Sequence, residues 1–229
     1  MYRAGHWLGL FCLSNFGRLE VLGRESVPPY GPLIVVANHV SYNDPPMLLA
    51  SIPRALHFIA KQELFNFTLT NYFLKQFNVY PFNRTGHGVD AMRLMLRLLA
   101  EDRAVVIFPE GHRSPDHAMR KAMLGVAYLA HKSQAPILPV GITGTETFPV
   151  WRLPIPLRHM RANIGQPFTL PMIEGNPSRQ VLESLRDMVM GRVAAMLPEE
   201  YRGVYATAQG PREDLANIPP AAGEGNGPS

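Results

Sequence analysis

The amino-acid sequence predicts an α/β fold, a mixed, largely parallel sheet flanked by helices, with an N-terminal apolar interfacial helix. Two runs made only of apolar residues, LIVVA at 33–37 and AVVIF at 104–108, are typical of strands buried on both faces. Strand runs alternate with segments of helical periodicity, which indicates helices packed on a partly parallel sheet. The 229 residues, 46% of them hydrophobic, suffice for one packed domain, or two at most.

The expected strands are short runs rich in β-branched and aromatic residues, which favour extended backbone. A proline-rich turn at 27–32 separates the first run from the second. The runs are 19–22 (LEVL), 33–37 (LIVVA), 56–60 (LHFIA), 79–82 (VYPF), 104–108 (AVVIF) and 137–142 (ILPVGI).

The expected helices are stretches in which apolar residues recur every three or four positions along one face. In 88–101, for example, Met92, Met95 and Leu99 share one side. One helix is expected to start near Pro45. Four others are expected at 65–75, 88–101, 122–131 and 179–197, the last of which ends before Pro198. Residues 206–229, rich in Gly and Pro, are expected to form a disordered tail.

The uncharged apolar segment 4–17 allows three interpretations: a signal-peptide core, a helix of the protein core, or an anchor at a membrane surface. It is shorter than the roughly 20 residues that span a bilayer and has no small-residue cleavage site. Because a hydrophobic helix at the start of a chain is hard to bury, we favour the membrane anchor. We therefore assign residues 1–24 to this interfacial helix and the first strand.

Composition excludes some site chemistries and leaves others open. Cys12 is the single cysteine, so neither an internal disulfide nor a cysteine-based zinc cluster can form. The 18 Arg against four Lys favour phosphate-bearing ligands, an anionic membrane surface or nucleic acid, because the guanidinium fork matches phosphate oxygens. The sequence has no phosphate-binding glycine loop and no G-x-S-x-G elbow, so a covalent acyl-enzyme has no evident nucleophile.

The first candidate site follows the strand 33–37, where open α/β sheets place ligands. His39 and Asp44 stand five positions apart in NHVSYND, so their side chains meet only if the chain turns between them. In that case Asp44 would orient the His39 ring, and His39 would act as a base toward a substrate hydroxyl. The alternative is that Asp44 only caps the helix that begins at Pro45 and that His39 is a core residue.

Polar groups also follow the strands 104–108 and 79–82. Glu110 and Arg113 can pair with each other or bind a polar head group, and Gly111 allows a ligand to approach backbone amides. Arg84 is a candidate phosphate ligand. Taken separately, a salt-bridged turn and a surface arginine explain these residues as well.

Four blocks of the sequence resemble those of the glycerolipid acyltransferases, typified by 1-acylglycerol-3-phosphate acyltransferases. They are NHVSYND (the NHxxxxD box), VYPFNR (the block ending in Arg), FPEGHRS (the FPEGTRS box) and ILPVGI (the proline-containing block), and they occur in the family's order. AKQEL at 60–64 also resembles the family's AKxEL stretch. The departures include His112, which stands where Thr is usual, and they leave the acceptor less defined than the reaction.

The resemblance implies a role for each candidate residue. His39 would be the general base and Asp44 its orienting partner. Arg84, Glu110 and Arg113 would contact the acceptor phosphate, and Lys61 and the backbone at Gly111 would stabilise the oxyanion.

The resemblance also implies an activity and partners. Residues 25–205 would form an acyltransferase domain that moves an acyl chain from coenzyme A or acyl carrier protein to a lysophospholipid acceptor, making phosphatidic acid. Direct attack by a hydroxyl on a thioester needs a base and an oxyanion donor but no metal and no other cofactor. We expect a peripheral membrane protein on the cytoplasmic side, with no nucleic-acid partner.

Two rival functions from other classes are a non-catalytic lipid-binding protein and a metal-dependent hydrolase.

The stretch 151–161, with three Arg and no acidic residue, is interpreted as a basic loop that either meets an anionic lipid surface or covers the core.

Overall fold

The protein is described by a computed structural model covering residues 18–66, 68–82, 88–147 and 159–206. The strands are β1 (Arg18–Leu22), β2 (Leu33–Ala37), β3 (Leu56–Lys61), β4 (Val79–Phe82), β5 (Ala104–Ile107), β6 (Ile137–Thr143) and β7 (His159–Ile164). The helices are α2 (Asp44–Ser51), α3 (Thr68–Gln76), α4 (Val89–Ala100), α5 (Gly125–Ser133) and α6 (Arg179–Ala194).

The strands form one seven-stranded sheet within these residues, in the order β1-β7-β6-β2-β5-β3-β4. Strands β2 to β6 run parallel to one another, whereas β7 runs antiparallel to β6 and pairs in parallel with β1. The predicted mixed, largely parallel α/β sheet is therefore confirmed. Because β2 and β5 are parallel neighbours, the segments that follow them leave the sheet at the same edge.

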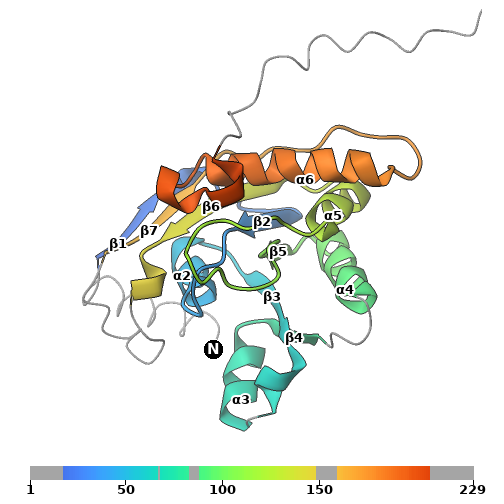
Figure 1. Cartoon of the computed structure of the whole chain (residues 1–229). Coiled ribbons are helices and arrows are strands. Elements are labelled where there is room, and N and C mark those ends of the chain that lie inside the picture. Colours follow the sequence, from blue (N-terminus) through green and yellow to red (C-terminus); the bar gives the residue numbers. More distant parts are fainter. Residues whose placement is uncertain (1–17, 67, 83–87, 148–158, 207–229) are drawn as a thin grey trace, which may run out of the picture.

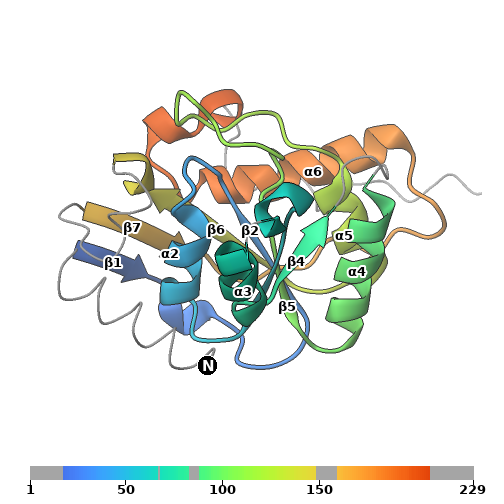
Figure 2. The same ribbon diagram turned by 90° about the horizontal axis from the view of Figure 1, so that it is seen from below.

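The sheet is covered on both faces, and β2 shows why its residues are all apolar. Leu33, Val35 and Ala37 pack on one face with α2, while Ile34 and Val36 pack on the other face with α4, α5 and α6. Figures 1 and 2 show α2 on the opposite side of the sheet from α6, and α3 beside β4 at the end of the sheet away from β1. Burial on both sides removes β2 from water and makes it the centre of the core.

Strand β7 was not predicted, and it corrects the interpretation of 151–161 as a loop. Met160, Ala162 and Ile164 are buried and alternate with the more exposed His159, Arg161 and Asn163, which is the period-2 pattern of a strand covered on one face. Polar or basic residues occupy every second position, so the apolar signal of this strand is weak. Residues 148–158 of the expected loop lie outside the described residues.

Helix α5 begins at Gly125, three residues later than expected. The preceding segment is not helical, and its amides bond elsewhere: Ala122 N–H donates to the Tyr205 hydroxyl, and Met123 N–H donates to the Pro109 carbonyl. These bonds tie the segment to the C-terminal part of the chain and to the loop after β5.

The first strand was placed correctly, but the expected N-terminal apolar helix and the expected disordered tail from 207 onward lie outside the described residues. Across the parts of the chain that are described, none of the helices has the length and apolar character needed to cross a bilayer.

Candidate active site

His39 and Asp44 lie in contact at the carboxyl end of β2. The Nδ1 atom of His39 is 2.7 Å from Oδ2 of Asp44. The chain turns between them, with Asp44 N–H donating to the Ser41 carbonyl, and Asp44 is the first residue of α2, followed by prolines suited to a first helical turn. The contact that the five-residue spacing permits is thus present, and Asp44 starts the helix as well as holding the imidazole.

The Asp44 carboxylate is fully buried and surrounded by donors. Its Oδ2 atom also accepts hydrogen bonds from the backbone N–H groups of Val40 and Ser41, each at 2.8 Å. Its Oδ1 atom accepts a hydrogen bond from the Thr145 hydroxyl at 2.5 Å. These donors compensate the cost of burying a charge. An ionised carboxylate only accepts, so Nδ1 of His39 carries the proton in that contact and Nε2 keeps a lone pair in the neutral ring.

The His39 ring packs against Phe108, the first residue beyond β5. The two ring centroids are 4.3 Å apart at an interplanar angle of 24°. The side chain remains 18% exposed, and no described residue hydrogen-bonds its Nε2 atom. The imidazole is therefore held at Nδ1 and on one ring face, while its basic nitrogen is left for a ligand.

Glu110 joins the loop after β5 to the loop after β2. It is only 2% exposed, and its two oxygens accept hydrogen bonds from the backbone N–H groups of His39 (3.0 Å) and Arg120 (2.9 Å). Burial raises the pKa of the Glu110 carboxyl, and these two hydrogen bonds oppose the rise. In return, the His39 carbonyl accepts from Ser114 N–H. Of the two alternatives for Glu110 and Arg113, the ion pair between them is absent from the described structure, because backbone amides occupy the Glu110 carboxylate.

Two residues that support the site were not predicted. The Asn38 side chain donates to the Ile142 carbonyl and accepts from the Ile142 N–H, so it fastens the end of β2 to β6. Thr145, in the 3₁₀ turn Thr145–Thr147 after β6, reaches Asp44 as described above. The sequence pattern marked the strand 137–142 that leads to Thr145 but gave no signal for the hydroxyl itself.

Gly111 and Arg113 occupy the turn that follows Glu110. Gly111 has a φ of 73°, its N–H donates to the Phe108 carbonyl, and a Cβ atom here would lie 2.5 Å from Cε of Met123. The Gly111 N–H therefore donates its hydrogen bond within the turn 108–111. The exposed Arg113 guanidinium lies over the Tyr42 ring, with Cζ 3.5 Å from the ring centroid.

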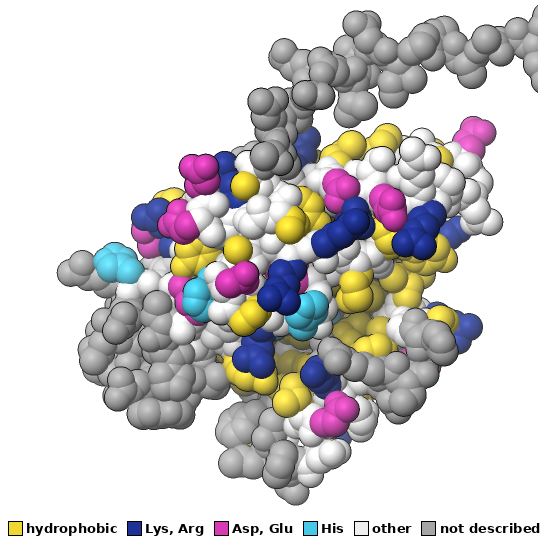
Figure 3. All heavy atoms as spheres, in the orientation of Figure 1, with side chains coloured by type: hydrophobic (Ala, Val, Ile, Leu, Met, Phe, Trp, Pro, Cys, Tyr) yellow, Lys and Arg dark blue, Asp and Glu magenta, His cyan; other side chains and the backbone are white. Residues whose placement is uncertain are grey.

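Lys61 is exposed at the carboxyl end of β3, on the same sheet edge, and no hydrogen bond or ion pair in the described structure links it to His39 or Arg113. Arg84 lies outside the described residues, two positions beyond the end of β4. On the face turned toward the viewer in Figure 3, Lys and Arg side chains gather around the middle, with His side chains beside them and hydrophobic side chains in the hollow below.

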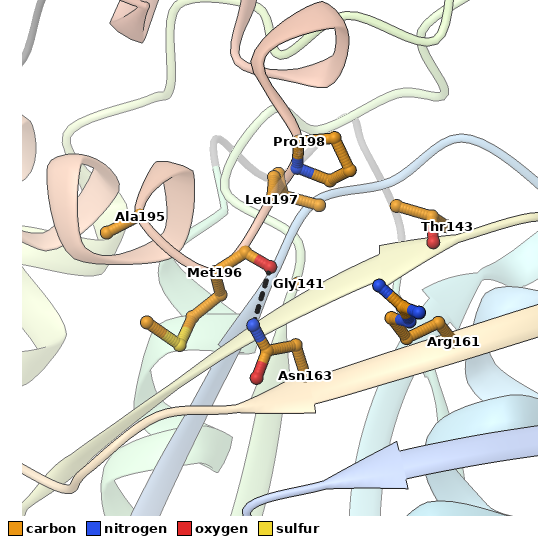
Figure 4. A pocket seen from close by; sticks show the side chains of 8 residues that line it. All are labelled: Gly141, Thr143, Arg161, Asn163, Ala195, Met196, Leu197 and Pro198. Atoms are coloured by element: carbon orange, nitrogen blue, oxygen red, sulfur yellow. Dashed lines mark hydrogen bonds between the residues drawn. The ribbon is translucent and has the colours of Figure 1, made fainter.

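The described residues bring together no group of three or more His, Cys, Asp and Glu side chains that could hold a metal. A separate cavity of about 260 Å³ lies between β6, β7 and the end of α6. Figure 4 shows Asn163 donating to the Met196 carbonyl there, with Gly141 beneath. A Cβ atom at Gly141 would lie 2.5 Å from that carbonyl oxygen, so glycine lets the chain after α6 approach the sheet. None of the candidate site residues lines this cavity.

Comparison with known proteins gives consistent matches. The family model described as Acyltransferase matches residues 18–143, more than half of the chain. The 1-acyl-sn-glycerol-3-phosphate acyltransferase of Bacillus subtilis is 26% identical over 79% of this chain and 89% of the relative. The 1-acyl-sn-glycerol-3-phosphate acyltransferase alpha of Mus musculus is 31% identical over 57% of this chain. The match spans about half (47%) of that longer relative. The crystal structure of the 1-acyl-sn-glycerophosphate acyltransferase PlsC from Thermotoga maritima superposes with a TM-score of 0.67 at 27% identity, covering 85% of this chain and 78% of that one.

Proposed function

Because the chain belongs to the Acyltransferase family, we propose that it transfers an acyl chain from a thioester to the free hydroxyl of 1-acylglycerol-3-phosphate, making phosphatidic acid. The observation that carries this proposal is the contact between His39 and a fully buried Asp44, which leaves the Nε2 atom of His39 open at the edge of the sheet. The names of the relatives from Bacillus subtilis and Mus musculus support the choice of acceptor.

The reaction needs one base and no covalent enzyme intermediate. The Nε2 atom of His39 takes the proton of the acceptor hydroxyl while the hydroxyl oxygen attacks the carbonyl carbon of the thioester. The carbonyl oxygen then becomes an oxyanion. When the carbon–sulfur bond breaks, the thiolate leaves and receives the proton from Nε2. The products are an ester and a free thiol, and His39 returns to its neutral form. Asp44 holds the ring through Nδ1 and stabilises the imidazolium between the two proton transfers.

The acceptor phosphate would lie on the arginine side of the site. Arg113 is exposed three residues beyond Glu110, whose carboxylate holds the backbone of His39, so the guanidinium and the imidazole belong to loops that are tied together. A planar guanidinium can donate two parallel hydrogen bonds to a phosphate. Lys61, at the carboxyl end of β3, remains a proposed ligand for the oxyanion, and Arg84, two positions beyond β4 in the sequence, remains a proposed ligand for the phosphate.

The lipid acceptor and the acyl thioester imply where the protein works. We assign it to the cytoplasmic side of a membrane as a peripheral protein, with coenzyme A or acyl carrier protein carrying the acyl chain. The apolar, uncharged composition of segment 4–17 supports a membrane-surface location, because apolar side chains near a chain terminus can be buried in the lipid interface.

The proposal is tested by incubating the purified protein with an acyl-coenzyme A and lysophosphatidic acid, measuring free thiol and phosphatidic acid. We expect equal amounts of the two products, and a His39→Ala variant at least about 100-fold slower, which is the low end for loss of a general base. His117→Asn is the matched control, because His117 is exposed with a φ of 64° that asparagine tolerates. Normal turnover by a folded His39→Ala protein would refute the base assignment, and thiol release without phosphatidic acid would refute the transfer.

A further inference from the structure

The loops after β2 and β5 are joined on the protein surface by one pair of side chains, Tyr42 and Arg113. Besides lying over the Tyr42 ring, Arg113 donates a hydrogen bond from Nη2 to the Tyr42 hydroxyl at 2.9 Å. Tyr42 is 56% exposed and is therefore not needed to fill the core. Among the described residues, Arg113 is the one that both hydrogen-bonds the Tyr42 side chain and stacks on its ring.

The backbone on both sides of this pair is fixed relative to the His39 imidazole. Tyr42 stands between His39 and Asp44, in the turn closed by bonds to the Asp44 carboxylate. Arg113 precedes Ser114, whose N–H donates to the His39 carbonyl at 2.9 Å. The Cα atoms of both residues are thus held by the same network that holds the base.

The remaining freedom of Arg113 lies in its side chain, and Tyr42 restricts it. A free arginine loses rotamer entropy when it binds an anion, whereas one already stacked on a ring loses less. The contact uses one face of the guanidinium and one Nη2 hydrogen. No described residue hydrogen-bonds its Nε or Nη1 atoms, so donors remain for an anion.

We propose that Tyr42 is a positioning residue for substrate binding: it holds Arg113 so that the guanidinium receives the phosphate monoester of the acceptor next to His39. The inference rests on the proposed function, since it assigns a phosphate-bearing acceptor to that site. Tyr42 acts on ground-state binding through Arg113 and takes no part in proton transfer.

The expected kinetic signature is a change in KM for lysophosphatidic acid with kcat preserved within about twofold. Tyr42→Phe keeps the ring and loses the hydroxyl, so KM should rise roughly threefold. Tyr42→Ala loses both contacts, and KM should rise roughly tenfold. Tyr30→Phe is the matched control, because Tyr30 is 85% exposed and its side chain is far less enclosed.

A double-mutant cycle separates positioning from an independent role. If Tyr42 works through Arg113, then Tyr42→Ala should change KM less than about twofold in an Arg113→Met background, because the shared interaction is already gone. Effects that multiply in the double variant would overturn the proposal, as would a fall in kcat at unchanged KM. Far-UV circular dichroism and the melting temperature confirm that each variant is folded.

A calorimetric arm keeps the inference testable without turnover. Glycerol 3-phosphate and inorganic phosphate are titrated into the wild-type and Tyr42→Ala proteins, and we expect Tyr42→Ala to weaken both in the same proportion. Weakening of glycerol 3-phosphate alone would overturn the proposal, because it would mean that Tyr42 affects recognition of the glycerol part and not of the phosphate, and no change for either ligand would overturn it as well. Absence of phosphatidic acid with normal, Tyr42-dependent binding of glycerol 3-phosphate would instead refute the proposed reaction and leave the phosphate site standing.

Discussion

Replacing Glu110 by glutamine distinguishes a residue that supports the base from one that touches the acceptor. In the structure both carboxylate oxygens of Glu110 accept backbone N–H groups, one from His39 and one from Arg120. Glutamine has nearly the same shape but presents an oxygen to only one of them and an NH₂ group to the other. One of the two backbone donors is then buried against another donor.

The cost follows from these contacts. Losing a hydrogen bond to a charged acceptor costs about 1.5–3 kcal/mol, and part of this is recovered because glutamine buries no charge. We expect a net loss near 2 kcal/mol, which for a chain of this size lowers the melting temperature by about 4–8 °C. Because the His39 amide is one of the affected donors, kcat should fall roughly tenfold, while KM for lysophosphatidic acid should change less than about twofold.

The pH dependence of stability gives a second measurement. Burial raises the pKa of Glu110 in the folded protein above its unfolded value, so the folded state binds the extra proton more tightly. The corresponding stabilisation is complete below the unfolded pKa and is lost as the pH rises through the folded pKa. Glutamine does not titrate, so the difference in melting temperature between wild type and Glu110→Gln should be larger near pH 5 than near pH 8.

The assay combines thermal unfolding at several pH values with steady-state kinetics on the same preparations. Glu183→Gln on α6 is the control, since that carboxylate lies on the surface in an exposed pair with Arg179. A raised KM with unchanged kcat and melting temperature would refute the reasoning. It would indicate instead that Glu110 contacts the acceptor. A stability difference that grows with pH would contradict the direction of the pKa shift.

Two further predictions concern residues that hold the loops in place. Thr145→Val removes the hydroxyl donor to the buried Asp44, so it should destabilise the protein by about 1.5–3 kcal/mol and lower kcat. Thr145→Ser keeps the hydroxyl and should keep wild-type stability and kcat, as measured by melting temperature and turnover. Equal behaviour of the two variants would contradict the role of the hydroxyl. Gly111→Ala places a Cβ at a φ of 73° and should destabilise the protein by about 1–2 kcal/mol in denaturant unfolding, mostly through backbone strain because the clashing Met123 terminus can move. A stabilising effect would show that the turn changes conformation.

Most of the sheet could be predicted from the sequence alone. Runs such as 33–37 and 104–108 are apolar at every position, which indicates strands buried on both faces. The structure has them as the strands β2 and β5 with nearly the same bounds. The pattern failed at β7, where Met160, Ala162 and Ile164 supply a weaker apolar signal and the intervening residues are polar or basic. A strand covered on one face carries buried apolar residues only at alternate positions, so its hydrophobic signal is weaker than that of a strand buried on both faces.

The sequence also pointed to the ends of β2 and β5 as the site, because parallel strands bring their carboxyl ends to one edge. The contacts of each polar residue there could not be predicted from the sequence and are known from the folded structure. Glu110 lies 71 positions from His39 and Thr145 lies 101 positions from Asp44, and neither spacing carries a periodic signal. Strand patterns arise from burial, which each short segment expresses by itself, whereas a hydrogen bond between two loops forms only after the sheet has aligned the strands that carry them.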